Sequence, residues 1–245
     1  DENRGQTAVT IPSTPDSVLG GNLKADRYQH RLLAGIFLLS AALLGFEILA
    51  VRLVSILLYP VASYLVISLA LLGLGASGGP LALRRRESPI SRAQIGACSA
   101  LFGMAVLLAL ASVWFASPSL TLSLLLILFL SLPFFLGGYA LAATLSMPGF
   151  SVSKVYFADL FGAGIGAGAV LLGLSYLGGF QAGLLLAALA FGSSALLHGG
   201  GLFSRLAIAT SLAFTLAALL IRPPHGIVPI APKELAHFAR LGERA

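Results

Sequence analysis

Three ionisable residues lie well inside apolar stretches of the sequence and are the first candidates for chemistry. They are Glu47, Arg52 and Asp159, and Tyr156 precedes Asp159 by one helical turn. A charge at the centre of a bilayer costs at least about 2.5 kcal/mol on insertion scales, so such a residue usually has a functional partner. Glu47 and Arg52 are five positions apart, about 140° around a helix, so we expect each to pair with a different helix.

Two interpretations of these charges stay open. In the first, they form polar contacts that fix the register of packed helices, and in the second they attract a ligand or a proton. We expect Asp159 near the start of its helix, where the helix N-terminus and Lys154 or Arg92 stabilise it. Arg52 is expected near the opposite boundary, where its long side chain reaches water.

The chain offers no catalytic constellation, no metal site and no cofactor site. Cys98 is the single cysteine and fits a small buried hydrophobe, while His198 stands alone at a helix end and is expected to be a satisfied interfacial histidine. The run GAGIGAG at 162–168 resembles a dinucleotide loop, but it lies inside an apolar helix, and the next acid is Glu234. We therefore predict that the protein is not an enzyme.

Glycine spacing instead predicts close packing of helices. Small residues four positions apart let two helix backbones approach closely in lipid. Such spacing occurs in the second and fifth apolar segments, and these two are expected to meet. The glycines concerned are Gly73, Gly75, Gly79, Gly162, Gly164, Gly166 and Gly168.

Composition shows which elements must position these residues. The chain of 245 residues is 58% hydrophobic and 10% charged, with a mean hydropathy of +0.95, and a soluble domain of this size has no interior large enough for so much apolar surface. About 20 apolar residues span a bilayer. We predict an all-α, polytopic bundle of about seven transmembrane helices, with a kink at Pro133, at residues 32–58, 61–83, 93–115, 120–145, 155–177, 180–197 and 202–221.

Charge distribution sets the expected topology. Basic residues gather in the N-terminal tail and in alternate connections, around Arg84–Arg86, Arg92, Lys154 and Arg205, which favours a cytoplasmic N-terminus and argues against nucleic-acid binding. We predict three parts: a flexible polar tail at 1–30, the bundle at 31–221, and a C-terminal tail at 222–245 with a short amphipathic helix over Lys233–Leu241.

Several segments resemble the membrane domain of bacterial fused spermidine synthase-like proteins. They are GFEILAVRLVSILL, LALLGLGASGGPLALRRR, LPFFLGGYALA and KVYFADLFGAGIGAGAVLLGLSYLGG. The resemblance covers residues 30–221 and implies a bacterial inner membrane location. Glu47, Arg52, Tyr156 and Asp159 match positions that the family uses.

Residues 229–241 are similar to the lead-in to the synthase domain, but its Gly-rich loop and substrate-binding acids are absent. Polyamine synthesis is therefore not carried over, and the chain is either a truncated product or a free-standing membrane relative. We expect a non-catalytic anchor or scaffold subunit whose partners are the lipid bilayer and other protein subunits. The alternative is an amine transporter or binding bundle that uses Glu47 and Asp159.

Overall fold

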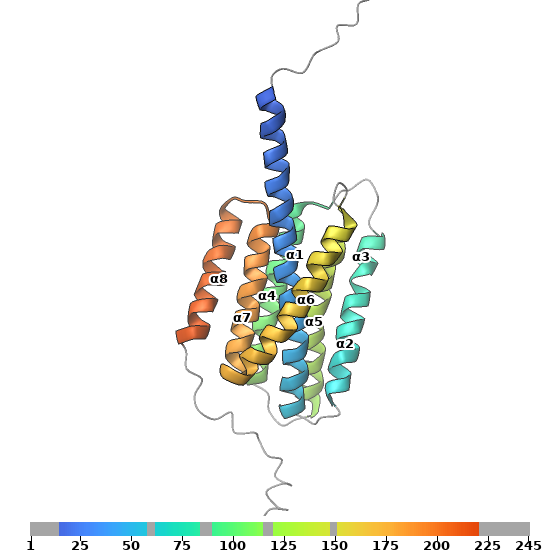
Figure 1. Ribbon diagram of the computed structural model, residues 1–245. Coiled ribbons are helices and arrows are strands. Elements are labelled where there is room, and N and C mark those ends of the chain that lie inside the picture. The colour runs from blue at the N-terminus through green and yellow to red at the C-terminus, as the bar shows by residue number, and fades with distance from the viewer. Residues whose placement is uncertain (1–14, 58–61, 84–89, 115–119, 148–150, 221–245) are drawn as a thin grey trace, which may run out of the picture.

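The computed structural model is a bundle of helices (Figure 1). It describes residues 15–57, 62–83, 90–114, 120–147 and 151–220, and within these ranges it contains no strand. The predicted all-α class is therefore confirmed for the described chain. The helices are α1 (Pro15–Leu57), α2 (Ala62–Ala76), α3 (Gly78–Leu83), α4 (Arg92–Trp114), α5 (Leu120–Leu145), α6 (Val152–Tyr176), α7 (Gly179–Leu197) and α8 (Leu202–Leu220).

Apolar length marks the bundle as a multi-pass membrane protein. Six stretches of the described helices are long and apolar enough to cross a bilayer, and α5 adds the shorter apolar stretch Phe129–Leu145. Each predicted segment coincides with one helix, except that residues 61–83 form the pair α2 and α3. Figure 1 shows α8 ending at the end of the bundle opposite to the one where α1 enters.

The first helix is much longer than the sequence predicted. It begins at Pro15, so residues 15–30, which we expected in a flexible tail, are helical, and the first part of this helix extends beyond the bundle (Figure 1). Proline favours the first position of a helix, and residues 16–31 contain no further proline that would end it. The predicted C-terminal tail at 222–245, with Lys233–Leu241, lies outside the described residues.

Two prolines inside apolar segments have different effects. Pro80 has no N–H to donate to the carbonyl of Ala76, and the helix is interrupted between them at Ser77, whose hydroxyl donates to the Leu74 carbonyl at 2.5 Å. Pro133, by contrast, is buried inside α5, and the helix continues past it to Leu145. The neighbouring helices therefore hold α5 together where its own hydrogen bonding is interrupted.

Helix α1 is the centre of the bundle. It packs against α2, α5, α6 and α7, while α4 lies between α5 and α7, and α8 packs on α7. At its core Phe46 lies 5.4 Å from Phe134 and 6.4 Å from Phe102, measured between ring centroids, and all three side chains are buried. These rings lock α1 to α5 and α4.

Among the described glycines, Gly162 and Gly166 of α6 lie closest to the backbone of another helix, α1. A Cβ atom on Gly162 would lie 2.3 Å from the carbonyl oxygen of Phe37, and one on Gly166 would lie 2.3 Å from that of Ala41. The two helices run parallel, with α6 inclined across α1 (Figure 1). Only glycine permits this contact, as the four-residue spacing predicted.

The expected partner of α6 was wrong, because α6 packs on α1 while the second segment packs on α5. A Cβ on Gly73 would lie 3.0 Å from the Phe134 side chain. The remaining glycines predicted for packing face outward, since a Cβ added to any of them would have no neighbouring atom within 4 Å; they are Gly75, Gly79, Gly164 and Gly168. Periodicity alone did not distinguish the inner glycines from the outer ones.

The contact between α1 and α6 predicts a contrast between two alanine substitutions. Gly166→Ala forces a methyl group into the α1 backbone, which should cost about 1–3 kcal/mol and lower the midpoint of thermal unfolding by several degrees. Gly168→Ala, on the open side of the same helix, meets no atom and should leave the midpoint unchanged or raise it slightly, because alanine favours a helix more than glycine does. Thermal denaturation of the detergent-solubilised protein, followed by gel filtration, measures both, and equal midpoints would contradict the described packing.

Candidate functional site

Asp159 and Ser40 join α6 to α1 within the membrane-spanning part of the bundle. The Ser40 hydroxyl donates a hydrogen bond to Oδ1 of Asp159 at 2.5 Å; Ser40 is buried and Asp159 is half-buried. The expected ion pairs of Asp159 are not formed, because Lys154 is exposed and Arg92 stacks on Tyr28 instead. Asp159 is thus held by a hydroxyl beside the Gly162 contact, as a polar clamp between two helices.

Tyr156 does not share this contact. It is 55% exposed on the outer face of α6, together with Phe157, Leu160 and Phe161. Aromatic residues near a helix end are typical of the membrane–water interface, where an apolar ring meets a polar tip. The structure therefore places Tyr156 on the surface of the bundle and Asp159 against α1, although they are one turn apart.

Glu47 and Arg52 lie on an open face of the central helix. Apart from Leu53, the partly or fully exposed positions in the second half of α1 recur at helical spacing, and we call them the α1 stripe: Leu44, Glu47, Ile48, Val51, Arg52, Ser55 and Ile56. At its edge Ile48 and Val51 also pack against the core, and the Val51 carbonyl accepts a hydrogen bond from Ser63 of α2. Glu47 forms no hydrogen bond or ion pair with a described residue, and neither does Arg52, which is exposed. The expected partners on other helices are therefore missing from the described part of the chain.

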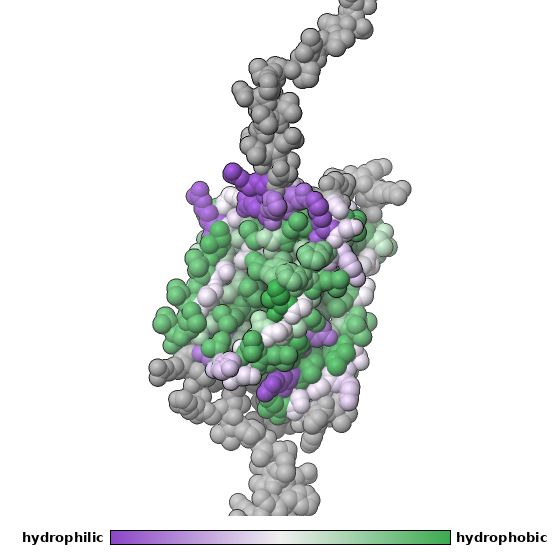
Figure 2. All heavy atoms as spheres, in the orientation of Figure 1, coloured by the Kyte–Doolittle hydropathy of each residue, from purple (hydrophilic) through white to green (hydrophobic). Residues whose placement is uncertain are grey.

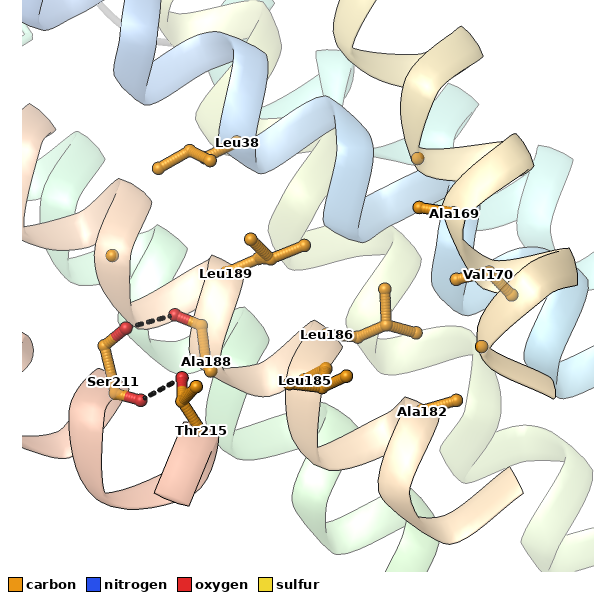
Figure 3. A pocket seen from close by; sticks show the side chains of 13 residues that line it. Leu38, Ala169, Val170, Ala182, Leu185, Leu186, Ala188, Leu189, Ser211 and Thr215 are labelled. Atoms are coloured by element: carbon orange, nitrogen blue, oxygen red, sulfur yellow. Dashed lines mark hydrogen bonds between the residues drawn. The ribbon is translucent and has the colours of Figure 1, made fainter. Parts of the chain in front are cut away.

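A groove opens on another face of the bundle, between α6 and α8 over α7 (Figure 3). Its volume is about 340 Å³ and its walls are almost wholly apolar. Its hydroxyl groups are already used: Ser211 donates to the Ala188 carbonyl at 2.8 Å, and Thr215 donates to that of Ser211 at 2.9 Å. The groove suits an acyl chain or another apolar group rather than an amine, whose charge would find no acceptor there.

A set of serines that sequence reasoning missed ties α7 to three other helices. Ser193 donates to the Gly35 carbonyl of α1 at 2.8 Å, and Ser194 donates to the Gly96 carbonyl of α4 at 2.7 Å. Ser204 of α8 donates to the Ala195 carbonyl at 2.8 Å. The signal was present as Gly-Ser-Ser inside an apolar run, since hydroxyls in lipid must find acceptors within the protein.

The other described side chains that could take part in catalysis or metal binding do not come together in one site. Among the described residues no three histidine, cysteine or acidic side chains come together as metal ligands. Cys98 is partly buried against the hydrophobic core. His198 was expected to be satisfied, but its buried Nδ1 has no hydrogen-bond partner, and its ring lies 4.3 Å from that of Phe203. A Cβ on Gly96 would lie 2.8 Å from Cα of His198, so α4 approaches the end of α7 closely here.

Comparison with known proteins gives no relative for this chain: no protein-family model, curated protein or solved structure matches it. The functional interpretation therefore rests on the residues and contacts of the bundle itself.

The Ser40–Asp159 clamp predicts a coupling that a double-mutant cycle can measure. Ser40→Ala leaves the partly buried carboxylate without its donor, which should destabilise the protein by about 1.5–3 kcal/mol, and much less when Asp159 is already Ala, which has no acceptor for the hydroxyl. The midpoint of thermal unfolding in detergent measures each variant. Ser175→Ala is the matched control, because that exposed serine bonds only within its own helix. Additive effects of the two substitutions would show that the clamp is not an energetic link.

Proposed function

We propose that this protein is a non-catalytic membrane module that anchors or scaffolds a partner subunit, which docks on the α1 stripe. The observation that carries the proposal is that Glu47 and Arg52 have no partner among the described residues although they lie on the central spanning helix. The Ser40–Asp159 clamp and the serines of α7 form hydrogen bonds between helices of the bundle. Glu47 and Arg52 form no such contact within its described part.

The depth of a charge in the membrane determines the free-energy cost of leaving it without a partner. Glu47 is about 15 Å from the end of α1 at Leu57 and about 24 Å from Arg31, at a rise of about 1.5 Å per residue. A carboxylate left against lipid at that depth costs at least about 2.5 kcal/mol. A second helix that covers the stripe removes this cost when it brings its own polar groups.

The stripe also defines the chemistry of that partner. The Glu47 carboxylate requires a hydrogen-bond donor or a basic side chain. Arg52, about 7.5 Å further along the helix axis, requires a hydrogen-bond acceptor nearer the membrane boundary. The positions between and around them are aliphatic or small: Leu44, Ile48, Val51, Ser55 and Ile56. Because the two charges are about 140° apart around α1, the partner covers them with two apolar helices, one with a polar residue for Glu47 and one with an acceptor for Arg52.

An amine transporter is less well supported. Glu47, Arg52 and Asp159 line none of the four described cavities, and the groove of Figure 3 is apolar. A transport path for a cation needs polar groups along its length. The acid that faces another helix, Asp159, is already bonded to Ser40.

The resemblance to spermidine synthase-like membrane domains extends the proposal to location. Basic residues gather at the end of the bundle where α1 enters, and hydrophobic residues cover most of the surface below them (Figure 2). Under the positive-inside rule this end faces the cytoplasm of a bacterial inner membrane. The scaffold then presents the Glu47 side of the stripe at mid-membrane and Arg52 toward the outer boundary.

The test is a site-specific photo-crosslink in native membranes. A photoreactive residue replaces Ile56 on the stripe, and in a second variant it replaces Leu108 on α4, which is similarly exposed at 60% compared with 52%. We expect one companion of defined mass at position 56, absent at position 108, and identified by mass spectrometry after mild-detergent purification.

Arg52→Gln supplies the link to the charge, because Arg52 is one helical turn from position 56, whereas Glu47 is nine residues away on the opposite side of α1. Loss of one charged interaction within a dry interface should lower the yield of the crosslinked companion by about tenfold. Crosslinks at position 56 to lipid alone, as at position 108, would overturn the scaffold assignment, and amine binding compared between native protein and Glu47→Gln would then be the deciding measurement.

A further inference from the structure

Three arginines converge on one small cavity near the end of the bundle where α1 enters, far from the α1 stripe. The volume of the cavity is about 150 Å³, and it is lined by Arg27, Tyr28, Arg31, Arg92, Leu196 and Gly199. Arg27 and Arg31 are one helical turn apart on α1, Arg92 is the first residue of α4, and Gly199 follows the end of α7. We propose that this arginine pocket binds the phosphate group of an anionic ligand.

Among the described residues, no acidic side chain compensates the positive charge of the pocket. None of the three guanidinium groups forms an ion pair with a described carboxylate, and Nε of Arg92 is buried without a hydrogen-bond partner. Three cations held together repel one another unless an anion joins them. The start of α4 and the end of α7 meet here with opposite partial charges of about one half each, so the helix dipoles nearly cancel. The three arginines therefore determine the electrostatic potential in the pocket.

One arginine is held in place before any ligand arrives. The guanidinium carbon of Arg92 lies 3.2 Å from the centre of the Tyr28 ring, a cation–π contact that fixes the plane of the group. Gly199 has a φ of +90°, and a Cβ there would lie 3.4 Å from Nη1 of Arg92, so this glycine leaves room for the side chain. A guanidinium fixed in this way loses little freedom when it donates two parallel hydrogen bonds to a phosphate.

The position of the arginine pocket in the bundle favours a phosphate group as its ligand over the carboxylate of a buried substrate. The pocket lies at the hydrophilic end of the molecule, where Figure 2 shows polar residues around α1 above the hydrophobic surface. This is the level of lipid headgroups in a spanning bundle. The cavity holds about five times the ~30 Å³ that one water occupies in the liquid, which is enough for a phosphate group. Phospholipid headgroups and free phosphate share this chemistry.

Two probes distinguish a phospholipid headgroup from free phosphate as the ligand. The purified full-length protein is titrated with phosphatidylglycerol in mixed micelles and, separately, with inorganic phosphate at constant ionic strength, with phosphatidylcholine micelles as the neutral reference. Native mass spectrometry and the shift of the thermal midpoint report binding. A saturable response to phosphatidylglycerol alone assigns the pocket to a lipid, and one to inorganic phosphate assigns it to the free anion; both support the proposal.

Substitutions locate the response. Arg31→Gln should weaken binding by about tenfold, because one charge-assisted contact is lost, and Arg31→Lys should restore part of it, because the charge returns without the planar donor pair. Arg205→Gln is the matched control, an exposed arginine at the same end that does not line the pocket. No saturable response to either probe would overturn the proposal, as would an equal loss in Arg205→Gln, which would reduce the effect to general surface charge.

Discussion

The bundle depends on the close approach of α6 to α1. Gly162 and Gly166 place one backbone directly on the other, and the Ser40–Asp159 hydrogen bond lies beside this contact. In lipid no hydrophobic effect drives two apolar helices together, so association rests on close van der Waals packing and on polar groups that bond across the interface. The α1–α6 contact has both. It fixes α6 against the central helix.

The central place of α1 explains why both proposed sites lie on it. Its inner face carries Phe46, and the helix contacts α2, α5, α6 and α7, so its outward positions are held at fixed angles. One end of the helix contributes two arginines to a cationic cavity, and the other presents a carboxylate and a guanidinium without partners among the described residues. Since one rigid helix connects them, the two sites keep a constant separation along the membrane normal.

Much of the fold follows from the sequence, because hydropathy and length alone locate spanning helices. The glycine pair at 162 and 166 was recognisable from its spacing, but its partner was not, since Gly73 shows similar spacing and packs elsewhere. The clamp partner Ser40 was missed because a lone serine in an apolar run carries no signal of what it faces. The arginine pocket unites residues from α1, α4 and the end of α7, which no local pattern brings together.

Where prediction failed, tertiary context was decisive. Sequence also leaves open what a proline does in an apolar run: α5 continues past Pro133, where a kink was predicted, whereas Pro80 follows the break at Ser77. Residues 15–30 look like a polar tail because they lack an apolar face, although they propagate a helix that the bundle has already nucleated. Cooperativity thus extends α1 beyond the region that hydropathy can detect.

That extension has a mechanical consequence. Residues 15–26 form a continuation, about 18 Å long, of the helix whose second half packs through Phe46 against the rings of Phe102 and Phe134. The projecting part is a lever arm, and the aromatic cluster is its fulcrum. Because α1 has no break between Pro15 and Leu57, it has no hinge. A sideways force on the arm therefore acts as a torque on the centre of the bundle. Whatever holds the arm therefore also sets the tilt of the membrane core.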